Sequence, residues 1–271
     1  MSKALVLLLL STLSLQIYAE ENNTEDNKGK NEANKPTITF PISQQRMFDQ
    51  DLTKYSDSNE VAWLGDKDNR FLTLWREQTT GNVIGTSWIF ADTYTSANNP
   101  NIIQTLRYQL SDKGLHTYSV SPLSQPLTSA HAEQRLQAQL LTLQDKTASQ
   151  IGKRLLILQG ANCQAIINIL VNNPDVYVDA IVLLSAHSPT PELAKQFMSQ
   201  MHQLNAPILD LYAQTESLAV IDEANKRHTA ATRINQGNYR QIEVIGLPGQ
   251  VETQIATSQM IYGWLVKLGW Y

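Results

Sequence analysis

The chain has 271 residues, of which 17% are charged and 42% hydrophobic, and its formal net charge is −4 at pH 7. This length suits one large domain, and this composition is that of an ordinary globular protein. A mildly acidic chain without a basic patch has no electrostatic reason to bind nucleic acid or anionic lipid, so neither is an expected partner.

The first nineteen residues, MSKALVLLLLSTLSLQIYA, have the pattern of a secretory signal peptide. A lysine precedes an apolar run from Ala4 to Leu10, and Ala19 lies at a suitable cleavage point. The run is too short, and too interrupted by serine and threonine, to favour a membrane anchor. We therefore expect an exported protein that has no stable membrane insertion once residues 1–19 are removed.

Residues 20–38 are dominated by asparagine, glutamate and lysine, with almost no apolar side chains. Such a segment cannot bury enough surface to offset its ordering entropy, so it is predicted to be a disordered linker. The folded domain is then expected over residues 39–271. Cys163 is the only cysteine of the chain, so no intramolecular disulfide can form and the core must hold the fold unaided.

Strand and helix signals alternate from about Phe40 onward. Ser43 is placed to cap a helix that runs to about Tyr55. The segments EVAWLG and RFLTLWRE are joined by a polar turn at residues 66–69 and predict a β-hairpin. Six further strands are predicted in VIGTSWIFA, HTYSVSP, RLLILQG, VDAIVLLSA, APILDLYAQ and YRQIEVIGL.

Helical patterns separate these strands. They lie near residues 101–113, 130–149, 162–171, 192–204, 217–234 and 253–268. This succession predicts an α/β fold with a mostly parallel, eight-stranded sheet, an antiparallel hairpin at its beginning, and helices on both faces.

This order of elements resembles the α/β-hydrolase fold over about residues 60–271. In that fold a sharp turn after the fifth strand reads G-x-S-x-G and displays a serine nucleophile. Here the turn reads GANCQA, in which Gly160 matches the first glycine of the motif and Asn162 occupies the position of the serine. No base can make an amide nucleophilic near neutral pH, whereas asparagine does tolerate a strained backbone. We therefore expect Asn162 to occupy the tip of the turn without catalysing a reaction.

The other parts of a hydrolase site are altered as well. The resemblance places an acid after the seventh strand, where Glu216 stands, with Asp210 inside the strand as a weaker candidate. It places a histidine after the eighth strand, where the sequence has none and the nearest polar residue is Gln250. After the third strand, where the resemblance places an oxyanion-hole turn, this chain has Asp92. Its carboxylate would disfavour a developing oxyanion if it pointed inward, and would be a simple turn residue if it pointed outward.

Two side chains keep a catalytic alternative open. Cys163 lies at a helix start, which lowers the pKa of a thiol, although a lone cysteine there more often packs as a small hydrophobe. His187 lies just past the sixth strand, either as a base or as a hydrogen-bonded loop residue. The five histidines lack any metal-ligand spacing, and the turn lacks the glycines of a dinucleotide site, so neither a metal nor a cofactor is predicted.

Several longer phrases resemble one group within the hydrolase superfamily. They are FLTLWRE, NIIQTLRYQLSDKGLHTYSVSP, the altered turn after LLILQG, APILDLYAQTES and IYGWLVKLGW. The group is an uncharacterised family of exported proteins of Gram-negative bacteria, domain of unknown function 3530, whose turn often lacks a serine. This resemblance implies a periplasmic location and brings no established activity with it.

Together these observations predict a periplasmic pseudo-hydrolase that binds an unknown small molecule or an envelope protein. The crevice at the carboxyl edge of an open α/β sheet persists even when catalysis is lost. The residues expected to surround it are Asp92, Asn162, Cys163, His187, Glu216 and Gln250. The alternative is an ester hydrolase that uses Cys163 or another non-standard nucleophile.

Overall fold

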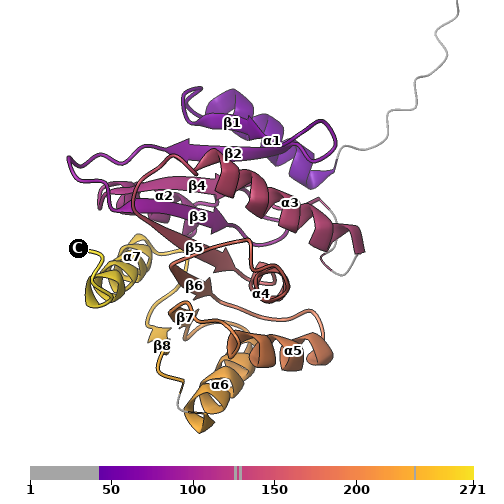
Figure 1. Ribbon diagram of the computed structural model, residues 1–271, viewed down its shortest axis with the longest axis vertical. Coiled ribbons are helices and arrows are strands. Elements are labelled where there is room, and N and C mark those ends of the chain that lie inside the picture. Colours follow the sequence, from indigo (N-terminus) through magenta and orange to yellow (C-terminus); the bar gives the residue numbers. More distant parts are fainter. Residues whose placement is uncertain (1–42, 125–126, 128–129, 235) are drawn as a thin grey trace, which may run out of the picture. The chain divides into compact units, whose positions relative to one another are not determined.

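The computed structural model describes residues 43–124, 127, 130–234 and 236–271 (Figure 1). The predicted signal peptide, the predicted linker and the first residues of the expected domain lie outside these ranges. Within them, no helix is both long enough and apolar enough to cross a bilayer.

Eight strands form one sheet in the order β1-β2-β4-β3-β5-β6-β7-β8 (Figure 1). The first two pairings, β1 with β2 and β2 with β4, are antiparallel, and all later ones are parallel. The predicted sheet and its opening hairpin are therefore confirmed. The strands are β1 (Val61–Leu64), β2 (Phe71–Arg76), β3 (Gly85–Phe90), β4 (Leu115–Val120), β5 (Lys153–Gln159), β6 (Ala180–Leu184), β7 (Ile208–Ala213) and β8 (Tyr239–Val244).

Helices pack on both faces of the sheet, and five of them cover one or the other of two large apolar clusters. Apolar side chains of α2 and α7 meet one face, while those of α3, α4 and α5 meet the other. β3, β5 and β6 lie in the middle and read as continuous buried runs because both of their faces are covered. The helices are α1 (Gln44–Tyr55), α2 (Ile103–Ser111), α3 (Ala130–Lys146), α4 (Asn162–Asn172), α5 (Pro191–Met201), α6 (Leu218–Arg233) and α7 (Val251–Lys267).

The N-terminal helix α1 begins where its cap predicts. The Oγ of Ser43 accepts a hydrogen bond from the backbone amide of Arg46 at 3.3 Å. Gln45 and Asp49 on this helix both contact the buried hydroxyl of Ser121, which follows β4. These polar contacts attach α1 to the end of the sheet at which the parallel strands finish.

Candidate functional site

The strand-to-helix turn after β5 has its tip at Gly160, two residues before the asparagine that the sequence pattern placed there. Gly160 has φ +64°, a left-handed conformation that glycine adopts without strain. Ala161 already has helical angles, and α4 begins at Asn162. The prediction that Asn162 stands at the tip is therefore wrong: the chain reaches its sharp bend earlier, at the only residue of the turn that lacks a side chain.

Asp92, in the connection from β3 to α2, fills the space that a side chain at the tip would need. A Cβ atom built on Gly160 would lie 2.1 Å from the carboxyl carbon of Asp92. The Oδ1 atom of Asp92 accepts hydrogen bonds from the backbone amides of Ala161 at 3.1 Å and Thr93 at 2.8 Å. The carboxylate therefore points inward, toward the turn, and not outward.

These two amides come from the two places that supply the oxyanion hole in a hydrolase of this fold. One belongs to the residue that follows the tip, and the other to the connection after the third strand. Here both donate to a resident carboxylate, so the chain supplies its own anion to the site. The arrangement binds negative charge with a side chain and leaves this donor pair no free capacity for a substrate oxyanion.

Asn162 and Cys163 lie beneath the turn and hold it in place. Asn162 is 2% exposed, and its Nδ2 atom donates to the backbone oxygen of Ala91 at 2.5 Å. The Sγ atom of Cys163 lies 3.3 Å from the backbone oxygen of Leu158 and is fully buried. Burial raises the pKa of the Cys163 thiol well above its ordinary value, so the nucleophilic thiolate is disfavoured.

A cleft of about 530 Å³ opens above the turn, at the carboxyl ends of the parallel strands. Asp92, Gly160, His187 and Glu216 line it, and they come from the loops after β3, β5, β6 and β7. This is the edge at which open α/β sheets bind their ligands. In the described part of the chain, no group of three or more acidic, histidine or cysteine side chains is arranged to hold a metal ion.

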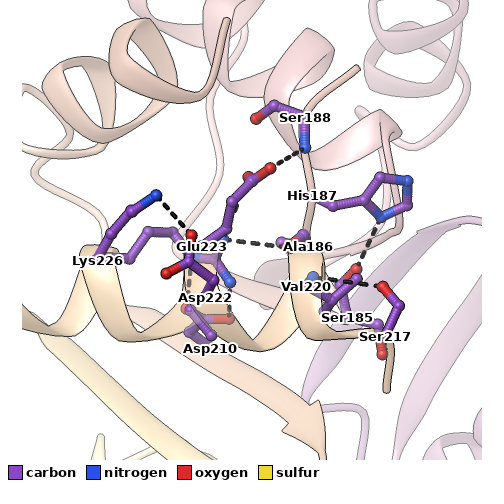
Figure 2. A network of polar contacts seen from close by, with 12 residues as sticks. Ser185, Ala186, His187, Ser188, Asp210, Ser217, Val220, Asp222, Glu223 and Lys226 are labelled. Atoms are coloured by element: carbon purple, nitrogen blue, oxygen red, sulfur yellow. Dashed lines mark hydrogen bonds and ion pairs between the residues drawn. The ribbon is translucent and has the colours of Figure 1, made fainter. Parts of the chain in front are cut away.

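The loop after β6 forms one wall of this cleft. Ser185 has φ +49°, which is uncommon for a residue with a side chain, and its Oγ donates to Oε1 of Glu216 at 2.5 Å. The Nδ1 atom of His187 lies 3.2 Å from the backbone oxygen of Ser185, and Glu223 on α6 accepts from the amide of Ser188 at 3.3 Å (Figure 2). Two glutamates thus hold this loop from the side of α6.

A buried ion pair supports the same loop from below. Arg227 on α6 donates to both carboxylate oxygens of Asp210 on β7, at 2.8 and 3.2 Å, and both side chains are almost fully buried. A third donor of Arg227 binds the backbone oxygen of Ala186 at 3.1 Å. Asp210 therefore anchors the wall of the cleft through Arg227 and does not itself line it.

The six residues expected around one crevice are divided by the structure. Asp92, His187 and Glu216 line the cleft, whereas Asn162, Cys163 and Gln250 do not. The first two of these are buried under the turn, and Gln250 is an exposed residue at the start of α7. Asn162 and Cys163 are buried because the sharp bend lies at Gly160. Both residues then belong to the first turn of α4, which packs inward.

Sequence reasoning missed the place of Gly160 at the tip of the turn, and it missed Ser185 and Glu223 altogether. For Gly160 a signal was present, since a glycine is the residue that occupies a left-handed bend most readily. Ser185 carried no such signal, and the place of Glu223 depends on the rotation of α6 about its axis.

The description "Protein of unknown function (DUF3530)" belongs to the family model that matches this sequence, over residues 2–133 and 124–267. The chain belongs to this family. The match covers nearly the whole sequence of this DUF3530 protein and confirms the resemblance found in its phrases. A comparison with curated proteins gives no significant match.

Solved structures show that the DUF3530 protein has the fold of α/β-hydrolases. It is similar to a dienelactone hydrolase from Anabaena variabilis, with a TM-score of 0.60 and 14% identity over 76% of this chain and 96% of that one. A serine hydrolase homologue from Coxiella burnetii matches with a TM-score of 0.59 and 12% identity, over 76% and 97% of the two chains. Esterase Pf2001 from Pyrococcus furiosus matches with a TM-score of 0.59 and 9% identity, over 76% and 89%. At these identities the likeness concerns the fold alone.

Proposed function

We propose that this protein is an exported, periplasmic binding protein that keeps the hydrolase fold and has lost its acyl-transfer chemistry. The observation that supports the proposal is the place of Asp92, whose carboxylate occupies the space of a nucleophile side chain and binds the amides of Thr93 and Ala161. An ester carbonyl at this turn would meet neither a nucleophile nor a free pair of donors.

The proposed binding site is the cleft above Gly160. Its volume of about 530 Å³ lies within the usual range for pockets that hold small ligands, and it combines apolar walls with a few polar groups. His187 and Glu216 are the side chains that we propose to contact the ligand directly, because both line the cleft and are partly exposed.

A second candidate function, ester hydrolysis by a non-standard nucleophile, has one observation in its favour. Ser185 has a strained backbone, lines the cleft, and donates its hydroxyl hydrogen to Glu216, which could act as its base. His187 bonds to the backbone oxygen of Ser185 instead of its hydroxyl, so a serine–histidine pair is not formed. Cys163, the nucleophile of the original alternative, is buried.

The deciding experiment is hydrolysis of short- and long-chain nitrophenyl esters by the purified protein, beside Ser185→Ala and Cys163→Ala. We expect no turnover above the buffer rate in any of the three samples. Turnover that disappears in Ser185→Ala would replace the binding proposal by a serine hydrolase, and turnover that disappears in Cys163→Ala would establish a thiol hydrolase.

Thiol labelling tests the cysteine separately. Because Cys163 is buried and its pKa is raised, we expect iodoacetamide near neutral pH to leave the native protein unlabelled and to label it fully in urea. Intact mass measures the added group. Complete labelling of the native protein within minutes would show an accessible thiolate and would revive the cysteine alternative.

A further inference from the structure

We infer that the cleft binds a small amphiphilic cation, namely a protonated amine carried on an apolar chain. This inference rests on the proposed binding function and adds the chemical class of the ligand. It comes from the charge of the cleft, from carboxylate oxygens that have no partner there, and from exposed apolar side chains at two adjacent loops of the same edge.

The charged side chains that line the cleft are all acidic in the described part of the chain. They are Asp92, Glu216 and Glu223, and neither lysine nor arginine lines it. Arg227 is 1% exposed and lies 4.0 Å from Glu223, but its short contacts are with Asp210 and the backbone oxygen of Ala186. A ligand in the cleft therefore meets a surplus of negative charge, which favours a cation and repels a carboxylate or phosphate.

Two carboxylates keep one oxygen each for a ligand. Asp92 uses Oδ1 for the two amides, and Glu216 uses Oε1 for the hydroxyl of Ser185. Within the described residues, no hydrogen bond ends on Oδ2 of Asp92 or on Oε2 of Glu216. An ammonium group has three donors and no acceptor, so it can bind such oxygens without leaving a polar atom of its own unmatched.

Apolar side chains line the inner wall of the cleft, and others lie exposed in the neighbouring loops at the same edge of the sheet. The inner wall includes Leu184, Leu211, Val220 and Val244. Four large apolar side chains, here called the apolar rim, lie more than half exposed in the loops and helix starts that follow β7 and β8, namely Leu218, Ile245, Leu247 and Val251. β7 and β8 are neighbours in the sheet, and a hydrogen bond of 3.4 Å from Thr215 to the oxygen of Gly246 joins the two loops.

An exposed cluster of this kind marks a binding surface more often than a single exposed side chain does. The cleft provides the charge and the rim provides the apolar contact, so a ligand with a charged head and an apolar chain satisfies both. The head group is placed at Oε2 of Glu216, with the negative charge of Glu223 on the same wall of the cleft, and the chain passes over Leu218 and Ile245.

The test compares three probes of equal length by ligand-observed NMR titration, namely hexylamine, hexanol and hexanoate. We expect hexylamine to bind at least about tenfold more tightly than the other two, because one hydrogen bond to a charged group supports a difference of that size. Equal affinity for the amine and the alcohol would overturn the cation inference. A different result, namely ester turnover by the same sample, would contradict the proposed binding function itself.

Variants locate the selectivity. We expect Glu216→Gln/Glu223→Gln to remove the preference for hexylamine over hexanol, and Asp145→Asn, which neutralises an exposed acid on α3, to keep it. A preference that survives in the double variant would overturn the inference, provided that its melting temperature shows it to be folded. The comparison of probes on the unaltered protein does not depend on the folding of any variant.

The apolar rim has a test of its own. From butylamine to octylamine we expect affinity to rise about twofold for each methylene, which corresponds to partial burial of the chain. Leu218→Ser/Ile245→Ser should flatten this dependence and leave the affinity for butylamine unchanged. A dependence on chain length that is identical in the double variant would remove the rim from the site.

Discussion

The space beside the α-carbon of Gly160 holds a hydrogen atom and nothing larger. The residue combines φ +64° with a carboxyl carbon of Asp92 at 2.1 Å from the place of a Cβ. Gly160→Ala should therefore lower the free energy of unfolding by about 2 to 4 kcal/mol, the sum of a left-handed alanine and an overpacked contact. Urea denaturation measures this loss of stability. Gly81→Ala is the control, because, its chain neighbours aside, a Cβ atom at Gly81 would meet no heavy atom of the described residues within 4 Å.

The same contact predicts a specific compensation. In Asp92→Ala/Gly160→Ala the clash is gone and only the backbone strain stays, so the double variant should lose less stability than the two single variants together. Additive losses would mean that the carboxylate does not occupy this space in solution.

Asp49 on α1 gives the stability a defined dependence on pH. Burial raises its pKa above the ordinary 3.8, although hydrogen bonds from Ser121 and Gln45 oppose the shift. Because the folded state holds this proton more tightly than the unfolded state does, the proton's stabilisation is complete below pH 3.8 and is lost as the pH rises through the higher folded pKa. Relative to wild type, Asp49→Asn should therefore gain stability between pH 3.5 and pH 7.

Thermal unfolding of the two proteins across this pH range measures the difference directly. Other carboxylates titrate in both proteins and cancel in the comparison. A difference in melting temperature that does not change with pH would show that the pKa of Asp49 is the same in the folded and unfolded states.

At the level of elements, α6 is attached to the sheet by one buried ion pair. Arg227→Met leaves Asp210 buried without its cationic partner and, among the described residues, with hydrogen bonds only from Tyr239 and Gln241, which should cost about 3 to 5 kcal/mol in urea denaturation. The neighbouring Lys226→Met breaks an exposed pair with Asp222 and should change the stability far less than Arg227→Met does. Similar losses in the two variants would contradict the structural role assigned to Arg227.

The strands and helices of this chain could be predicted from its sequence because their patterns are local. Buried runs such as RLLILQG and AIVLL have no other stable placement than the middle of a covered sheet, and Ser43 signals its helix by its own side chain. The antiparallel hairpin followed from its polar turn, in which Asp66 accepts a hydrogen bond from the amide of Asn69.

The site could be predicted only in part, because its geometry depends on contacts between distant segments. Gly160 and Asn162 both tolerate a left-handed bend, and the sequence does not say which of them the end of β5 delivers to the tip. The contact of Asp92 with Ala161 spans 69 residues, and no local pattern encodes it. Glu216 was found because it follows a strand end, whereas Glu223 lies inside a helix, where carboxylates are common.

At the level of the whole molecule, export is the property that the sequence predicts and that can be measured most directly. Cleavage after Ala19 removes one lysine and leaves a chain that starts at Glu20. We expect the protein recovered from the periplasm of an expressing Gram-negative bacterium to have the intact mass of residues 20–271. A full-length mass in the cytoplasmic fraction would contradict the signal peptide.

The inward carboxylate of Asp92 has a consequence for the chemistry that this fold could regain. A hydrolase that cleaves an ester ends its cycle with a carboxylic acid at its oxyanion amides and must release that acid before the next substrate binds. In this protein the carboxylate at those amides is the side chain of Asp92. Because it is covalently attached, it cannot dissociate as a reaction product does, and its effective concentration at the amides stays high. The serine of Gly160→Ser would therefore be blocked unless Asp92 were also shortened, so acyl transfer from this position would require both changes together.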